Sequence, residues 1–361
     1  MDIITSTIGS SIQVWENHDG KFVCATEVGQ LRSCIPKISF FAVSPDGKYI
    51  CVACEKYCQL SRISGTDTTH TIYDNFSYPI TCVAVSNNSV AMATEGGDIF
   101  LHNIKFSRSN LKNNLQPIRS LSFSPSGTYL ASVTGNGTIL IWNISDGTEY
   151  ELYNSSVKQT IFYGSTLSPM SLCVDGYEPA RCVNWSPTED HIVVGTSYGN
   201  SYVLDVKSGK KITSLIRFDG CIKSIIYSPD GTKIALGRED GSSQICSAID
   251  GSLEYSFEKH KKYSGWRNIS FSHDGKLFAS TNGDSIYVWD MKSKECLHTL
   301  STDKIFTGMS FIFDRQALQN QQEAMFAVAI LFDQKESDLF VPPEVWSSFF
   351  DCISWRDWRN C

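Results

Sequence analysis

The chain has 361 residues with a formal net charge of −7, and only 19% of its residues are charged. Because this acidic balance gives no overall basic field, we expect no general binding of nucleic acid through counterion release. The longest apolar run, Ala324 to Phe332, is too short to span a lipid bilayer, so we expect no membrane insertion.

Thirteen cysteines raise the question of disulfides. The first residues, Met1 to Ile4, include an acidic side chain where a secretory signal peptide needs basic ones, and the first positive charge is Lys21. We therefore expect a cytoplasmic or nuclear protein with reduced thiols.

The first predicted elements are three strands between Asp2 and Val28, with the sequences IITST, SSIQVWE and KFVCATEV. The clearest pattern further along the chain has alternating runs at Ile118 to Ser124, Tyr129 to Thr134 and Thr138 to Asn143. Two turn sequences, Ser-Pro-Ser-Gly and Gly-Asn-Gly, separate these runs, which predicts an antiparallel meander. We expect its fourth strand at Thr148 to Tyr153.

The same pattern recurs along the chain when the runs are aligned on Ser124. The copies centre on Ser44, Ser86, Ser186, Ser228 and Ser272, and a weaker copy starts at Phe306. With Ser124 in its place between Ser86 and Ser186, the successive spacings are 42, 38, 62, 42 and 44 residues. A period near 40 to 45 residues with one four-stranded sheet per period is typical of a β-propeller. The predicted fold class is therefore all-β, with four-stranded antiparallel blades.

The ends of the chain are predicted to meet in one blade. Phe306 to Phe313 supplies a first strand with no others after it, and Asp2 to Val28 supplies three strands with no first one. Pairing them closes a ring of seven blades and removes exposed sheet edges. Ala324 to Phe332 could instead begin an eighth blade. We expect the propeller to occupy residues 1–335.

Two stretches interrupt the period. Asn154 to Pro179 is extra length that we place between the last strand of one blade and the first of the next, either as a decorated loop or as an arm that contacts a partner. Residues 336–361 form a tail in which an apolar stripe at helical spacing follows Pro342-Pro343. This short amphipathic helix could dock on the propeller or on a partner. The stripe consists of Trp346, Phe349, Phe350 and Ile353.

Tryptophan ends the third strand in three repeats, at Trp15, Trp142 and Trp289, and Trp289-Asp290 is a Trp-Asp dipeptide. With these residues the chain resembles the WD40-repeat family. His102, Leu204 and Cys246 stand at the tryptophan position in other repeats. The resemblance implies a hydrogen-bonded network within a blade, for which the last repeat offers candidates. They are His260, Ser280, Asp284 and Trp289.

Sequence patterns for catalysis or metal binding are weak. Cys51, Cys54 and Cys58 resemble half a zinc site, but no second ligand pair has suitable spacing. Ser272-His273-Asp274 contains the residue types of a catalytic triad, but it aligns with the Ser-Pro-Asp-Gly turns of other repeats, so we interpret it as a turn. No phosphate-binding loop of the GxxxxGK[ST] kind occurs. We expect no cofactor, no metal and no enzymatic activity.

A candidate binding surface comes from one repeated position, five residues before each anchor serine. In the WD40 arrangement, this position begins the innermost strand at the top mouth of the central channel. Ser39, Thr81 and Thr307 occupy it in the other repeats, so its positive charge is confined to an arc. The arc consists of Arg119, Arg181, Lys223 and Arg267, and Arg238 in a neighbouring loop would extend it.

These cations would favour a carboxylate- or phosphate-bearing segment of a protein partner. The resemblance therefore implies a non-enzymatic scaffold or adaptor in a multiprotein complex. One alternative is a substrate receptor of a cullin-RING ubiquitin ligase, for which related propellers use W-D-x-R, although Trp289 to Lys292 ends in lysine here. Another is a propeller hydrolase with a metal in the channel.

Overall fold

A computed structural model provides the structure, and it describes most of the repeats. All elements in the described part of the chain are β-strands. These residues therefore contain no helix that is long and apolar enough to cross a bilayer. The described residues are 2–7, 12–18, 21–28, 38–62, 71–73, 76–103, 108–112, 116–135, 137–144, 170–172, 179–217, 220–239, 241–257, 268–282, 284–301 and 306–312.

The described strands form seven four-stranded antiparallel sheets, which we call blades. One blade contains β1 (Asp2–Thr7), β2 (Ile12–His18), β3 (Lys21–Val28) and β28 (Phe306–Ile312). Every other blade uses four successive strands. These are β4–β7 (Phe40–Val43, Tyr49–Cys54, Tyr57–Arg62, Thr71–Tyr73), β8–β11 (Ile80–Val85, Ser89–Thr94, Asp98–Asn103, Arg108–Lys112), β12–β15 (Ile118–Phe123, Tyr129–Thr134, Ile139–Asn143, Met170–Leu172), β16–β19 (Ala180–Trp185, His191–Thr196, Ser201–Asp205, Lys211–Ser214), β20–β23 (Ile222–Tyr227, Lys233–Arg238, Ser243–Ser247, Leu253–Phe257) and β24–β27 (Ile269–Phe271, Leu277–Asn282, Ser285–Asp290, Cys296–Ser301).

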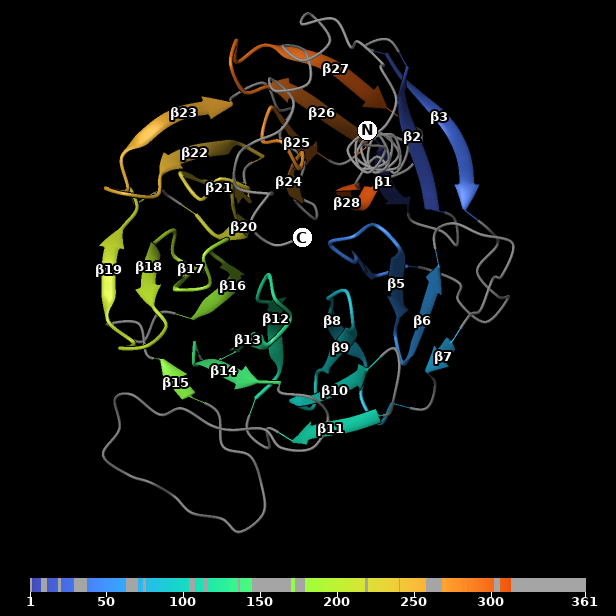
Figure 1. Cartoon of the computed structure of the whole chain (residues 1–361), viewed down its shortest axis with the longest axis vertical. Coiled ribbons are helices and arrows are strands. Elements are labelled where there is room, and N and C mark those ends of the chain that lie inside the picture. Colours follow the sequence, from blue (N-terminus) through green and yellow to red (C-terminus); the bar gives the residue numbers. More distant parts are fainter. Residues whose placement is uncertain are drawn as a thin grey trace, which may run out of the picture. The chain divides into compact units, whose positions relative to one another are not determined.

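The predicted pairing of the two ends of the repeat region is confirmed. Strand β28 runs antiparallel to β1, with Phe311 opposite Ile3 and Met309 opposite Thr5. The innermost strands β28, β4, β8, β12, β16, β20 and β24 each contact the next and close a ring within the compact unit Met1–Phe313 (Figure 1). We call the side of the ring where these strands begin the top face. Because Ala324 to Phe332 lies outside the described residues, seven as the total number of blades stays a prediction.

The repeated serine holds the turn after each innermost strand. Ser272 Oγ donates to Asp274 Oδ1 (2.6 Å) and accepts a bond from the N–H of Leu277 (2.9 Å). Ser44 makes the same two bonds, with Asp46 and Tyr49. These bonds satisfy the polar groups of the turn itself. Ser272 to Asp274 is therefore the turn that the sequence predicts, because its hydroxyl bonds the carboxylate rather than His273.

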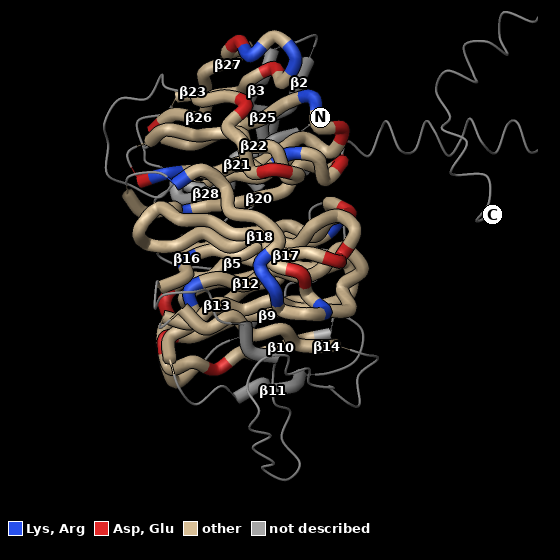
Figure 2. The backbone as a smooth tube through the Cα atoms, turned by 90° about the vertical axis from the view of Figure 1, so that its left-hand side faces the viewer, with Lys and Arg blue, Asp and Glu red and all other residues tan. Residues whose placement is uncertain are grey.

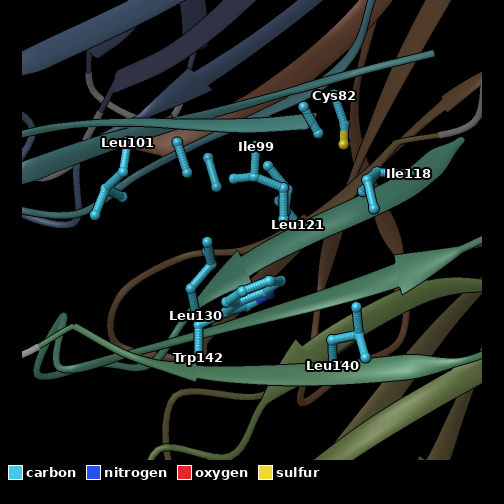
Figure 3. Packing of buried hydrophobic residues seen from close by; sticks show 11 residues of the cluster. Cys82, Ile99, Leu101, Ile118, Leu121, Leu130, Leu140 and Trp142 are labelled. Atoms are coloured by element: carbon cyan, nitrogen blue, oxygen red, sulfur yellow. The ribbon is translucent and has the colours of Figure 1, made fainter. Parts of the chain in front are cut away.

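The core lies between blades, as the contact between blades β8–β11 and β12–β15 illustrates (Figure 3). Cys82, Ile99 and Leu101 from one blade pack against residues of the next, including Leu130 and the 1% exposed Trp142. Packing of this kind between neighbouring sheets holds the innermost strands, and with them the top face, in fixed positions.

The fourth strand of blade β12–β15 differs from the prediction. It is β15 (Met170–Leu172), whose residue Met170 pairs with Ile141 and whose residue Leu172 pairs with Ile139. The long extra stretch therefore connects the third and fourth strands of this blade instead of following the fourth. The expectation was wrong because the alternating pattern of Thr148 to Tyr153 lies next to the third strand in sequence, and a three-residue strand far from it gives little signal.

Several other expectations fall outside the described residues and stay predictions. They are most of the stretch Asn154 to Pro179, the domain boundary at residue 335, and the tail stripe of Trp346, Phe349, Phe350 and Ile353.

Candidate functional site

Four successive innermost strands begin with the same irregularity at the top face. The register of β8, β12, β16 and β20 against the following strand shifts at the second residue of each, which is a β-bulge. The residue before each bulge is at most 3% exposed. A bulge takes one residue out of the ladder and redirects its side chain. The bulged residues are Thr81, Arg119, Arg181 and Lys223.

One hydrogen bond fixes the turn that faces each bulge. In all four blades, the residue that follows the second strand donates its N–H to the carbonyl two residues before the bulge. We call the donor the opposing residue. The bonds are Glu95 to Pro79 (2.8 Å), Gly135 to Pro117 (2.7 Å), Ser197 to Pro179 (2.9 Å) and Glu239 to Cys221 (3.0 Å). The backbone around the bulge is thus alike in these blades, and their side chains differ.

The opposing residue decides whether a bulged cation is neutralised. Lys223 Nζ lies 3.0 Å from Glu239 Oε1, so this blade presents an ion pair. Gly135 faces Arg119, and Ser197 faces Arg181; neither can supply a carboxylate. The Arg119 guanidinium lies beside Gly135, with Nε 3.7 Å from the position that a Cβ would take there.

Arg119 and Arg181 form no ion pair with any residue that the structure describes, although Arg119 is exposed and Arg181 is half-buried. Lys and Arg are interleaved with Asp and Glu over the ring (Figure 2). Whether a cation is neutralised therefore depends on its immediate neighbours more than on the face of the ring where it stands. The two arginines stand on adjacent blades, whose innermost strands β12 and β16 contact each other.

The other residues of the predicted arc differ from these two. Arg238 ends β21, its backbone pairs with Ile222, and its Nη1 donates to Ser242 Oγ (3.2 Å). Arg267 lies outside the described residues. Of the predicted arc, the structure therefore brings together Arg119 and Arg181, with Lys223 beside them in an ion pair.

Sequence reasoning missed the opposing residues. The arc was found by aligning only the innermost strands, whereas the ion pair depends on the turn between the second and third strands. Aligning that turn on Thr94, Thr134, Thr196 and Arg238, each just before an opposing residue, would have shown Glu, Gly, Ser and Glu in succession.

The cysteines that suggested a metal site are buried in the core. Cys51, Cys54 and Cys58 are at most 2% exposed, and Cys51 Sγ lies 3.1 Å from Cys58 Sγ. The pKa of the Cys58 thiol is raised well above its usual value, mainly because the thiol is buried and also because Cys51 lies next to it. Among the described residues, no group of three or more His, Cys, Asp or Glu side chains could hold a metal ion.

Two blades contain part of the hydrogen-bonded network that the resemblance implies. Trp142 Nε1 donates to Ser132 Oγ (3.0 Å), and Trp289 Nε1 donates to Ser280 Oγ (3.3 Å). Asp284 accepts a bond from Ser285 Oγ (2.9 Å), and His260 lies outside the described residues. Asp290, in the Trp-Asp dipeptide, accepts the backbone N–H of Lys292 (2.9 Å) and so caps its own turn.

Comparison with known families agrees with this architecture. The family model described as WD domain, G-beta repeat matches residues 106–143 and 251–290. The chain therefore carries WD40 repeats in these two places, as the tryptophan pattern predicts. The second match runs from β23 through β26 and ends at Asp290, and the first ends at Asn143, directly after the buried Trp142. The described blades between and around these matches share the same four-stranded topology.

Several known WD40-type proteins resemble the chain at low identity. It is 23% identical to the SIR4-interacting protein SIF2 of Saccharomyces cerevisiae over 258 residues, which are 71% of this chain and 45% of that protein. It is 25% identical to the WD repeat-containing protein SL1-17 of Schistosoma mansoni, over 48% of this chain and 50% of that protein. Protein NEDD1 of Homo sapiens is 22% identical over 66% of this chain and 36% of its own length. The chain thus spans half or less of the length of these relatives.

Proposed function

We propose that this WD40 protein is a non-enzymatic scaffold that binds acidic or phosphorylated segments of protein partners at its top face. In this proposal it belongs to a multiprotein complex in the cytoplasm or nucleus. The name of one relative, the SIR4-interacting protein SIF2, states a protein interaction of that relative and supports a scaffold role here by analogy.

The observation that carries the proposal is the pair of cations on adjacent blades, Arg119 and Arg181. Both stand on bulges of rigid innermost strands, and neither faces a carboxylate among its opposing residues. A guanidinium can donate two parallel hydrogen bonds to a carboxylate or phosphate, which makes arginine well suited to such groups. An anionic segment that crosses both blades would therefore be held at two points.

The spacing of the blades suggests a probe for this site. Packed sheets lie about 10 Å apart, and an extended chain advances about 3.3 Å per residue. Acidic side chains three residues apart therefore match neighbouring blades. A fluorescein-labelled peptide with the sequence D-G-G-D-G-G-D, and its counterpart with phosphoserine in place of aspartate, are suitable ligands for fluorescence anisotropy.

The test combines Arg119→Glu with Arg181→Glu. We expect the double variant to bind both peptides on the order of tenfold more weakly at low salt, because two attractive charges become repulsive. High salt should reduce the difference, since it screens exposed charges. Its melting temperature should stay near that of the wild type, because surface changes usually alter stability by less than about 0.5 kcal/mol.

The control variant makes the same change in net charge elsewhere. Lys207→Glu with Lys292→Glu reverses two exposed lysines in turns between third and fourth strands, away from the bulges. This control should bind the peptides like the wild type. If both double variants lose the same affinity, only net charge matters, and the top-face site is refuted.

A further inference from the structure

The blade next to the two arginines carries the opposite charge at the same place. In blade β8–β11 the bulged residue is Thr81, and its opposing residue is Glu95. Thr81 Oγ1 donates to Ala93 O (3.3 Å), so its hydroxyl turns back to its own sheet. Glu95 is exposed and forms no ion pair with any described residue.

An exposed aromatic ring accompanies this carboxylate. Tyr78 is 51% exposed and precedes Pro79, the residue whose carbonyl accepts the N–H of Glu95. Its ring lies against Gly96, the residue after Glu95: a Cβ on Gly96 would come within 2.3 Å of Tyr78 Cδ2. Only glycine leaves room for the ring in this position. The turn thus holds an aromatic face next to an acidic side chain.

The carboxylate of Glu95 and the ring of Tyr78 favour binding of a cation rather than an anion. An exposed carboxylate pairs with lysine or arginine, and the face of a tyrosine ring attracts the same cations. Going around the ring from β8 to β20, the bulge positions therefore present a negative group, two positive groups and a neutral ion pair. The order is Glu95, Arg119, Arg181, and Lys223 with Glu239.

We infer that the segment bound at the top face carries a basic side chain about three residues from the first of its acidic groups, at the end that lies over Glu95 and Tyr78. This inference rests on the proposed function and adds charge order to it. A segment with the same charges in another order would place its cation against an arginine and be disfavoured, which is specificity through repulsion.

Three fluorescein-labelled heptapeptides of equal composition, blocked at both ends, test the order: K-G-G-D-G-G-D, D-G-G-D-G-G-K and D-G-G-K-G-G-D. The first two allow for either chain direction. We expect the better of these two to bind about two- to fivefold more tightly than the third, a range typical of one exposed ion pair. In Glu95→Gln this preference should become smaller, because the carboxylate that pairs with the terminal lysine is gone, while the dependence on Arg119 and Arg181 remains.

A matched pair of tyrosine variants tests the aromatic face. Tyr78→Ala should reduce the preference for a terminal lysine, and Tyr78→Phe should keep it, because the ring is retained. Tyr198 is 59% exposed and follows Ser197, which is not acidic, so Tyr198→Ala should leave the preference unchanged.

The outcomes separate the two proposals. If Arg119→Glu with Arg181→Glu weakens binding, but the wild type does not distinguish the peptides or Glu95→Gln keeps the preference undiminished, charge order is refuted and the anionic site stands. If no peptide binds, or if the arginine variant binds them all like the wild type, both proposals fail.

Discussion

Blades β16–β19 and β20–β23 are neighbours with nearly the same backbone and different charge. Each begins with a bulge, at Arg181 and Lys223, and each closes the facing turn with a hydrogen bond to the carbonyl two residues earlier. The opposing residue is Ser197 in one and Glu239 in the other, and only the second forms an ion pair. In such a fold, the repeated backbone sets where a charge stands, and a single facing side chain sets whether a partner meets it.

The same two blades also differ at the other end of their innermost strands. Ser228 Oγ donates to the carboxylate of Asp230 (2.5 Å), whereas Ser186 Oγ meets the hydroxyl of Thr188 (3.2 Å). The repeated serine therefore bonds an ionisable side chain in one turn and a neutral hydroxyl in the other. Mutations at three places test this difference between the blades: the contact between them, this turn, and the top face.

A substitution at the contact between the two blades should have the largest effect on the stability of the fold. Gly251 has φ +75°, and a Cβ there would lie 2.4 Å from Ser214 O, a backbone atom of the neighbouring blade. Gly251→Ala should therefore destabilise the fold by about 2–4 kcal/mol, through left-handed strain and through separation of the blades. Thermal or denaturant unfolding measures this.

Gly231→Ala is the matched control for the change at Gly251. Gly231 has a similar φ of +72°, but a Cβ there would meet Pro187 Cδ at 3.5 Å, an ordinary contact. It should cost only the strain of the left-handed conformation, about 1 kcal/mol. Equal losses in the two variants would show that the contact between blades contributes nothing at Gly251.

The turn at Asp230 should give the next largest effect, and it should depend on pH. Burial opposes ionisation of this carboxyl, but hydrogen bonds from Ser228 and Thr232 outweigh it and hold its pKa below the usual value. Since the folded-state pKa is depressed, the stabilisation is present above the unfolded-state pKa and is lost as pH falls through the folded one.

Asp230→Asn should therefore lower the free energy of unfolding by about 1 kcal/mol at pH 7. The difference from the wild type should shrink below pH about 4, the usual range of aspartate. Thr188→Ser, at the equivalent position of the neighbouring blade, where the serine bonds a hydroxyl, serves as the control and should show no such pH dependence. A loss that is the same at pH 7 and pH 3 would contradict the role of the ionised carboxylate.

How far the sequence predicts these features depends on how local each one is. The spacing of Ser124 and its equivalents predicts the blades, because each turn is fixed by bonds among residues five apart. The strand β15 (Met170–Leu172) escapes prediction, because a long connection separates it from its partner and three residues carry no clear period. The pairing of Lys223 with Glu239 is also non-local: it joins a bulged residue of β20 to the turn after β21, and alignment of the innermost strands alone does not reveal it.

The smallest change, at the top face, most directly tests what separates the two blades. Glu239→Gln removes the carboxylate that pairs with Lys223 and should make a third cation available next to Arg181. The affinity for D-G-G-D-G-G-D should rise about two- to fivefold at low salt, as expected for one exposed charge pair. Ser197→Glu should do the converse: it places a carboxylate opposite Arg181 and should weaken binding by a similar factor. Both sites are at the surface, so melting temperatures should stay near that of the wild type.

The two variants combined exchange the roles of the blades and should bind with nearly wild-type affinity, because one cation is gained and one neutralised. If Glu239→Gln and Ser197→Glu shift the affinity in the same direction, the opposing residue does not control the charge that a partner meets.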